Sequence, residues 1–395
     1  MKLMNMRTRF LPILALLAVV QGIFAQVPAG YYTSAQNLTG PQLQLALHNI
    51  IKGHTVKSYD YLWTAFATTD KLPGGNVCYD MYSYRTTATP PYTYTIPSNQ
   101  CLITPGYENY CYNREHSFPK SWFGGEVSPM YTDLFHVIPT DSYVNSRRSD
   151  YPYGEVSAAT WTSMNGSKLG PCAVDGYTGT VFEPVDEYKG DLARNYFYMV
   201  TRYADVVAGW ENYSTESDAV LDGTQYPAFE PWTLNMLIQW HLSDPVSDKE
   251  VARNDSVYTI QGNRNPFIDY PGYVALMWPQ YSPVLPEPTL YPSTFSGHNI
   301  TLQWVDATGA VTPTAYLIRW STTGFDQIAD PENGTLYPND NQTLNVPAGT
   351  GHALIRNLLP ATTYYFKIFG YVTEGPFVTY KTSGAVPAVT ATTSS

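Results

Sequence analysis

The hydrophobic pattern of this chain changes its period once, at a proline-rich segment. Before residue 282 apolar residues recur at helical spacing, and beyond residue 292 they alternate with polar residues as in strands. The segment between them, residues 282–292, holds Pro283, Pro286, Pro288 and Pro292. Proline at that density is typical of a stiff linker. Because the chain has 395 residues, which is long for a single core, we expect two domains.

The part before the linker, residues 26–281, predicts helices separated by long loops. Helical spacing covers residues 39–56, 59–66, 191–207 and 231–242. The stretch between the second and third of these is rich in Tyr, Pro, Gly and Thr, which indicates loops. Together with the segment beyond the linker, this pattern predicts an α+β chain.

Residues 293–395 predict an all-β sandwich. Alternation is clear around Trp304, Trp320 and Phe366, and turn residues separate these runs. Residues 358–368 resemble the strand-F region of fibronectin type III domains, in which Tyr364 would be the corner tyrosine and Trp304 the buried tryptophan of strand B. This resemblance implies adhesion, spacing or display, with a surface or matrix ligand.

The first 25 residues predict export. Basic residues precede a short apolar run, residues 10–20, and the small residue Ala25 follows, which is the pattern of a secretory signal peptide. The run is short for a membrane span, and no later stretch is apolar enough to form one. We expect a mature chain from Gln26 that is secreted, periplasmic or held at the cell surface, and monomeric.

Four cysteines, an even number, predict disulfides in an exported protein. They are Cys78, Cys101, Cys111 and Cys172. The sequence leaves all three pairings open. A zinc site is the alternative, but no Cys-x-x-Cys spacing favours it.

Charge is scarce and acidic overall. The formal net charge is −11 and only 14% of residues are charged, which excludes a protein that coats DNA through a basic surface. Against that background, one window of residues 113–150 gathers the side chains that hydrolytic sites use. They are Glu115, His116, Asp133, His136, Asp141, Asn145, Arg147 and Arg148.

A helix is expected after Pro139, with Thr140 as its cap. On that helix Asp141, Asn145 and Arg148 would share one face. The segment before it looks extended, so the neighbours Glu115 and His116 should point to opposite sides. If both serve one site, the strand must bulge or end there.

The chemistry that fits these residues is phosphodiester hydrolysis. A neutral histidine can take a proton from water as general base. Mg²⁺ prefers oxygen ligands and keeps several waters, so a carboxylate and an amide suffice to hold it. An arginine can bind phosphate oxygens bidentately.

Residues 27–280 resemble the bacterial endonuclease I family, secreted and periplasmic nucleases with a ββα-metal (His-Me finger) core. The motif is Arg114-Glu115-His116-Ser117-Phe118-Pro119, followed by Asp133, Pro139, Val144, Asn145 and Arg148. Residues 45–56, 78–83, 165–172 and 261–269 also look like the family. The resemblance implies that His116 is the general base and that Glu115 and Asn145 hold one Mg²⁺, for which Mn²⁺ or Ca²⁺ could substitute. We infer a catalytic role for Arg148.

Two departures from the family pattern affect the phosphate contact. His136 stands where better-known relatives have Asn, and would contact phosphate or brace the site, as would Asp141. The spacer between Gly125 and Asp133 lacks the insertion that carries the phosphate-binding arginine of those relatives. One of three arginines must then supply that charge: Arg147, Arg148 or Arg264.

These residues predict a secreted Mg²⁺-dependent endonuclease that cuts DNA, and RNA as a second substrate, with little sequence preference and with 5′-phosphate products. One alternative is an adhesion or matrix-binding protein that acts through the fibronectin-like domain. Another keeps the enzyme but gives it a small extracellular phosphodiester as substrate.

Overall fold

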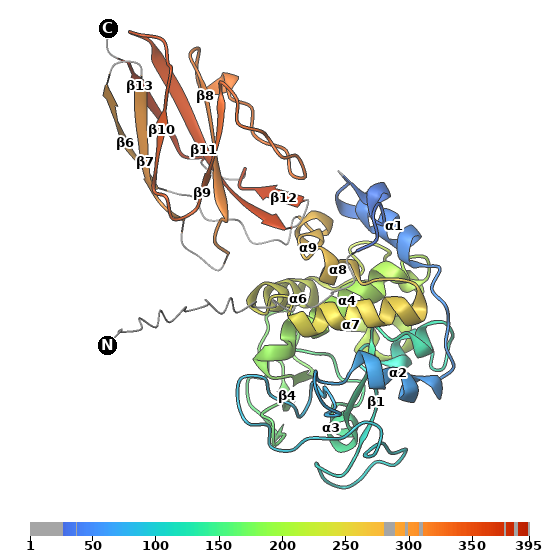
Figure 1. The fold of residues 1–395 in the computed structure, drawn as a ribbon. Coiled ribbons are helices and arrows are strands. Elements are labelled where there is room, and N and C mark those ends of the chain that lie inside the picture. Colours follow the sequence, from blue (N-terminus) through green and yellow to red (C-terminus); the bar gives the residue numbers. More distant parts are fainter. Residues whose placement is uncertain are drawn as a thin grey trace, which may run out of the picture.

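The computed structural model describes residues 27–36, 38–279, 289–296, 299–307, 311–374, 377–382 and 386–393. The expected signal peptide and most of the proline-rich segment lie outside these residues. In Figure 1 the helices and the strands beyond residue 289 form two separate bodies. The domain boundaries at residues 25, 281 and 292 stay predictions.

The first body is mainly helical. Its helices are α1 (Gly40–Ile51), α2 (Tyr61–Thr69), α3 (Ser142–Arg148), α4 (Lys189–Arg202), α5 (Thr215–Asp218), α6 (Pro231–Ser243), α7 (Asp248–Gln261), α8 (Pro266–Asp269) and α9 (Tyr273–Met277). Short 3-10 turns lie at Thr33–Ala35, Lys120–Phe123, Met130–Thr132, Asp186–Tyr188, Val207–Gly209 and Glu211–Tyr213. The four expected helical stretches correspond to α1, α2, α4 and α6. None of the described helices is both long enough and apolar enough to cross a bilayer.

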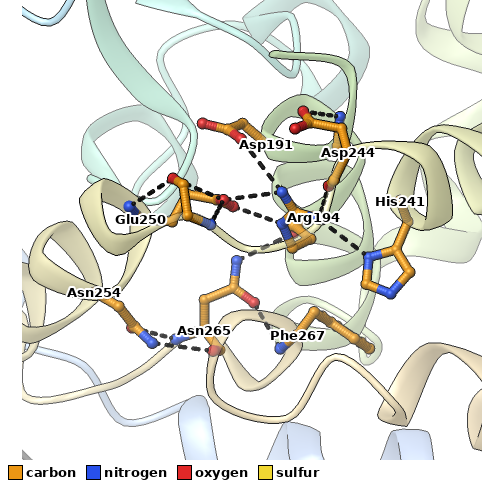
Figure 2. Close-up of polar contacts among 10 residues, drawn as sticks. Asp191, Arg194, His241, Asp244, Glu250, Asn254, Asn265 and Phe267 are labelled. Carbon is orange, nitrogen blue, oxygen red and sulfur yellow. Dashed lines mark hydrogen bonds and ion pairs between the residues drawn. The ribbon is translucent and has the colours of Figure 1, made fainter. Parts of the chain in front are cut away.

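Helix α4 is the centre of this body, and every one of its residues is buried. Its Arg194 is fully buried and lies at the centre of the polar contacts drawn in Figure 2. The guanidinium donates to both carboxylate oxygens of Glu250 on α7, at 2.5 and 2.9 Å. It also donates to Asp191 at 3.3 Å and to the carbonyl of Asp244 at 2.9 Å. This network joins α4 to α7 and to the end of α6.

A two-stranded hairpin leads directly into a helix. Strand β1 (Tyr112–His116) pairs antiparallel with β2 (Val137–Asp141), and α3 begins at the next residue. The register runs from Tyr112 opposite Asp141 to His116 opposite Val137 without a shift. A small sheet of β3 (Trp161–Thr162), β4 (Lys168–Pro171) and β5 (Thr180–Glu183) follows. The chain therefore has the ββα order that the sequence predicted.

The second body is a β-sandwich, as expected. One sheet has the order β10 (His352–Ile355), β7 (Asn299–Val305) and β6 (Thr289–Ser296). The other has the order β12 (Phe377–Tyr380), β11 (Thr363–Glu374), β8 (Ala315–Ser321) and β9 (Thr343–Pro347), with β13 (Ala388–Thr392) also paired to β11. A short 3-10 turn lies at Phe325–Gln327. Trp304 is buried in the core of the sandwich. The Tyr364 hydroxyl accepts a hydrogen bond from the Leu359 amide at 2.9 Å, as a corner tyrosine does.

The cysteines only partly follow the prediction. Cys101 and Cys111 form a disulfide that closes the loop before β1. Cys78 and Cys172 are free thiols, the first buried and the second half-buried, so the expectation that all four are paired is wrong. Cys78 packs into the main hydrophobic core, where a thiol serves as a small apolar side chain.

Candidate active site

Buried polar contacts with α7 hold the end of the loop between β1 and β2 in place. Arg253 pairs with Asp70 at 2.8 Å and donates to the carbonyls of Leu134 and Val137 at 2.6 and 3.2 Å. Gln261, the last residue of α7, accepts a hydrogen bond from the Leu134 amide at 2.7 Å. These buried polar contacts fix where β2 begins, and so fix the end of β1 beside it.

Asp141 positions α3 by capping it. Its carboxylate accepts hydrogen bonds from the amides of Tyr143 and Val144 at 2.8 and 2.9 Å, the pattern of an N-cap. The other oxygen accepts from the hydroxyl of Tyr94 at 2.5 Å. The prediction that Thr140 is the cap and that Asp141 lies within the helix is therefore wrong. Thr140 lies in β2, and the Asp141 carboxylate is occupied by the Tyr94 hydroxyl, the Asn109 amide and the start of α3.

His116 is the last residue of β1, so the strand ends there and does not bulge. Its Nε2 lies 2.9 Å from the carbonyl oxygen of Tyr131. Because a carbonyl can only accept, Nε2 carries the proton and Nδ1 carries the lone pair. No described residue binds Nδ1. Burial, and then the neighbouring His136 ring, lower the pKa of His116 to about 3, so the imidazole is neutral at physiological pH.

Glu115 lies one residue earlier and is also buried. Its Oε1 accepts from the Tyr82 hydroxyl at 2.9 Å and from Arg148 Nη1 at 3.0 Å. No described side chain donates a hydrogen bond to its Oε2, and the His116 backbone amide also acts on this carboxylate. Burial raises the pKa of Glu115 to about 7, although Arg148 and Tyr82 oppose that shift.

Helix α3 brings Asn145 against β1. The side chain is half-buried and its Nδ2 lies 3.4 Å from the carbonyl oxygen of Arg114, the residue before Glu115. Among the described residues nothing binds Asn145 Oδ1. One carboxylate oxygen and one amide oxygen, on adjoining elements, thus have no side-chain partner among the described residues.

This pair of oxygens fits a cation that prefers oxygen ligands and keeps much of its water, as Mg²⁺ does. The described part of the chain contains no group of three or more His, Cys, Asp and Glu side chains arranged to hold a metal. Glu115 and Asn145 are the residues that would hold the ion.

The three candidate arginines differ sharply. Arg148 is fully buried and donates to the carbonyls of His116 and Ser117 at 3.0 and 2.7 Å, in addition to Glu115. Arg264 is equally buried, and its guanidinium is occupied by carboxylates of Asp255 and Asp269. These ion pairs hold the loop after α7. Of the three, Arg147 alone is half-buried with no carboxylate partner in the described chain, and its guanidinium lies 5.4 Å from the Trp161 ring centre.

His136 braces the site from within. It is fully buried, its Nε2 lies 2.7 Å from the carbonyl oxygen of Met130, and its ring centre is 5.4 Å from that of His116. Of the two roles considered for it, packing against His116 is the one its contacts support.

Sequence reasoning missed two tyrosines that complete the site. Tyr82 binds Glu115, and its hydroxyl oxygen is 2.7 Å from that of Tyr153. The similarity of residues 78–83 to the family could have pointed to Tyr82. Nothing in the local pattern around Tyr153 distinguishes it from a packing residue.

Sequence comparison identifies relatives of the first body. The Endonuclease I family matches residues 39–272. Extracellular ribonucleases of Bacillus subtilis (strain 168) and Bacillus amyloliquefaciens are each 34% identical over 254 residues, which is 63% of this chain and 78% of the relative. An "Endonuclease-1" of Buchnera aphidicola (subsp. Baizongia pistaciae) is 25% identical over 138 residues, 35% of this chain and 46% of that protein.

Among solved structures, the second body resembles an FN3 domain of human collagen XX, with 24% identity, a TM-score of 0.19, and coverage of 27% of this chain and 92% of that one. The family match spans more than half of the chain and includes β1, β2 and α3. The chain therefore belongs to the endonuclease I family and is a nuclease.

Proposed function

We propose that this protein is a secreted, Mg²⁺-dependent endonuclease in which His116 is the general base and Glu115 and Asn145 hold the metal. The observation that carries the proposal is the state of His116, a neutral imidazole whose Nε2 is fixed by a backbone carbonyl and whose Nδ1 is bound by no described residue. A base of this kind can take a proton without first losing one.

Each residue of the site has a separate role in the proposed hydrolysis. His116 Nδ1 accepts a proton from the attacking water, and the Tyr131 carbonyl keeps the ring oriented and stabilises the imidazolium that forms. Bound Mg²⁺ would supply neutralisation of the charge that develops on the phosphate. Arg147 is the arginine we assign to a non-bridging phosphate oxygen. The products would carry 5′-phosphate and 3′-hydroxyl ends.

The substrate class is nucleic acid of both kinds. The Bacillus relatives are named ribonucleases and the Buchnera relative an endonuclease, which favours testing RNA beside DNA. The word "extracellular" in the Bacillus names, together with the apolar N-terminal segment of this chain, supports secretion. Residues 26–281 would form the nuclease, with residues 293–395 as a sandwich that carries a surface or matrix ligand.

The test is plasmid nicking and RNA cleavage by the chain from Gln26 onward, with Mg²⁺ and with EDTA. EDTA should abolish both activities, and His116→Ala should lower the rate by about 10²–10⁴-fold. His352→Ala, an exposed histidine in the sandwich, is the matched control and should keep full activity. Full activity of His116→Ala, or full activity in EDTA, would contradict the proposal.

The phosphate contact of Arg147 has its own test. Arg147→Ala should raise KM and lower the slope of log KM against log salt by about one. Arg356→Ala removes an exposed arginine from the sandwich and should change neither quantity. An unchanged salt slope in Arg147→Ala would remove this residue from the site.

A further inference from the structure

One oxygen of the Glu115 carboxylate is held by two buried side-chain donors, while no described side chain binds the other. We propose that Tyr82 and Arg148 are positioning residues, which hold Oε1 so that Oε2 is the oxygen presented to the metal. The inference rests on the proposed role of Glu115 as a metal ligand. It gives a function to Tyr82 and changes that of Arg148 from catalysis to positioning.

The contacts of the two donors are directed at one atom. The Tyr82 hydroxyl and Arg148 Nη1 approach Oε1 at 2.9 and 3.0 Å, and neither distance involves Oε2. Two donors on the same oxygen restrict rotation of the carboxylate. They also reduce the cost of binding a cation, because the free oxygen needs no rearrangement before the ion arrives.

Tyr153 lies behind Tyr82 and Arg148 and contacts both. Its hydroxyl oxygen is 2.7 Å from that of Tyr82, and its ring centre is 4.6 Å from the Arg148 guanidinium. Tyr82 has a single hydroxyl proton and gives it to Glu115, so Tyr153 donates to Tyr82. Tyr153 thus contacts both residues that hold Oε1.

Burial separates this role from a substrate contact. Tyr82 and Arg148 are fully buried and Tyr153 is 1% exposed, so none of the three can touch a phosphate. Arg148 additionally holds the carbonyls of His116 and Ser117, and its removal would disturb the end of β1. Among the described residues, the Tyr82 hydroxyl binds no carboxylate other than Glu115, so Tyr82→Phe is the informative change.

The chain offers a matched control for that change. Tyr198 is also fully buried and donates to a buried carboxylate, that of Asp133, at 2.8 Å. Asp133 is not a proposed ligand. Tyr198→Phe therefore removes the same group from the same kind of environment, away from the metal.

The experiment titrates Mn²⁺ into the metal-free chain from Gln26 onward by calorimetry, and follows urea unfolding of each variant. Tyr82→Phe should raise the Mn²⁺ dissociation constant about tenfold, within the range typical of residues that orient a ligand. The lost activity should return at high Mn²⁺ with kcat near the wild-type value. Tyr153→Phe should give a smaller increase. Tyr198→Phe should leave the dissociation constant within about twofold of wild type. The urea midpoints of both Tyr82→Phe and Tyr198→Phe should fall, because each loses a buried hydrogen bond.

Glu115→Gln separates the inference from the function on which it rests. If Glu115→Gln binds Mn²⁺ as tightly as wild type, the metal assignment itself fails. If Glu115→Gln weakens binding while both Tyr82→Phe and Tyr153→Phe stay within twofold of wild type, the metal assignment stands and the positioning role is refuted. An equal loss in Tyr198→Phe would also overturn it, since the effect would then be one of general stability.

Discussion

Replacing Arg194 by Met should destabilise the nuclease strongly, because this guanidinium is the centre of the buried network in Figure 2. The change removes both hydrogen bonds to Glu250 and those to Asp191 and the Asp244 carbonyl. Two carboxylates would then be buried without their cation. Removing one partner of a buried ion pair costs about 3–5 kcal/mol.

The structure places the cost at the lower end of that range. Glu250 keeps the amide of Ser247 as a donor at 2.8 Å, through the capping box of α7. Burial raises the pKa of Asp191 well above its ordinary value, so this carboxyl can take up a proton when its cation is lost. We therefore expect a loss of about 3 kcal/mol in the free energy of unfolding. For a domain of this size it corresponds to a fall in Tm of about 6–12 °C.

The assay is urea and thermal unfolding followed by tryptophan fluorescence. Arg202→Met, in the same helix, is the control: Arg202 is also buried, but its hydrogen bond goes to the His54 ring at 3.1 Å and not to a carboxylate. It should cost about 1 kcal/mol. In Arg194→Met/Glu250→Gln one of the two orphaned charges is gone, so the double variant should lose less than the sum of the two single changes. A loss below about 1 kcal/mol in Arg194→Met, or strict additivity, would refute the reasoning.

Three further predictions concern other parts of the chain. Reducing the Cys101–Cys111 disulfide, or replacing both cysteines by Ser, should lower the free energy of unfolding by about 2–3 kcal/mol, and equal urea midpoints with and without reductant would contradict this. Tyr364→Phe leaves the Leu359 amide without its acceptor and should cost the sandwich about 1–2 kcal/mol, while nuclease activity stays unchanged. Burial raises the pKa of Asp80 to about 7, so the folded state binds this proton more tightly than the unfolded state. Stability should therefore fall as pH rises from about 4 to 7, and Asp80→Asn should flatten that part of the urea-midpoint profile.

The sequence predicted the elements whose buried faces are apolar. Helices α1, α2 and α6 bury leucines, isoleucine, phenylalanine and tryptophan at helical spacing, so periodicity finds them. Helix α7 was missed because the side chains it buries are mostly polar, among them Glu250, Arg253 and Asn254. A hydrophobic pattern cannot reveal a helix whose buried side chains are polar and form hydrogen bonds.

At the site, the sequence identified the residues but not their contacts. The resemblance of the motif that holds Glu115, His116 and Asn145 to the endonuclease I family implied a ββα arrangement, and the strand does end at His116. It could not show that Arg148 points inward or that Arg264 pairs with two acids, because both depend on long-range packing. For the same reason the one disulfide could not be chosen among three pairings.

The contacts of α7 with the loop between β1 and β2 determine when the site can form during synthesis. Strands β1 and β2 are complete when residue 141 has been synthesised, but the groups that fix their turn, Arg253 and Gln261, come more than a hundred residues later. A nascent or truncated chain that ends before α7 would carry every proposed catalytic side chain without the support that sets their spacing. Nuclease activity should therefore appear only once the whole first body has been synthesised. This would delay the hydrolysis of nucleic acids near the ribosome.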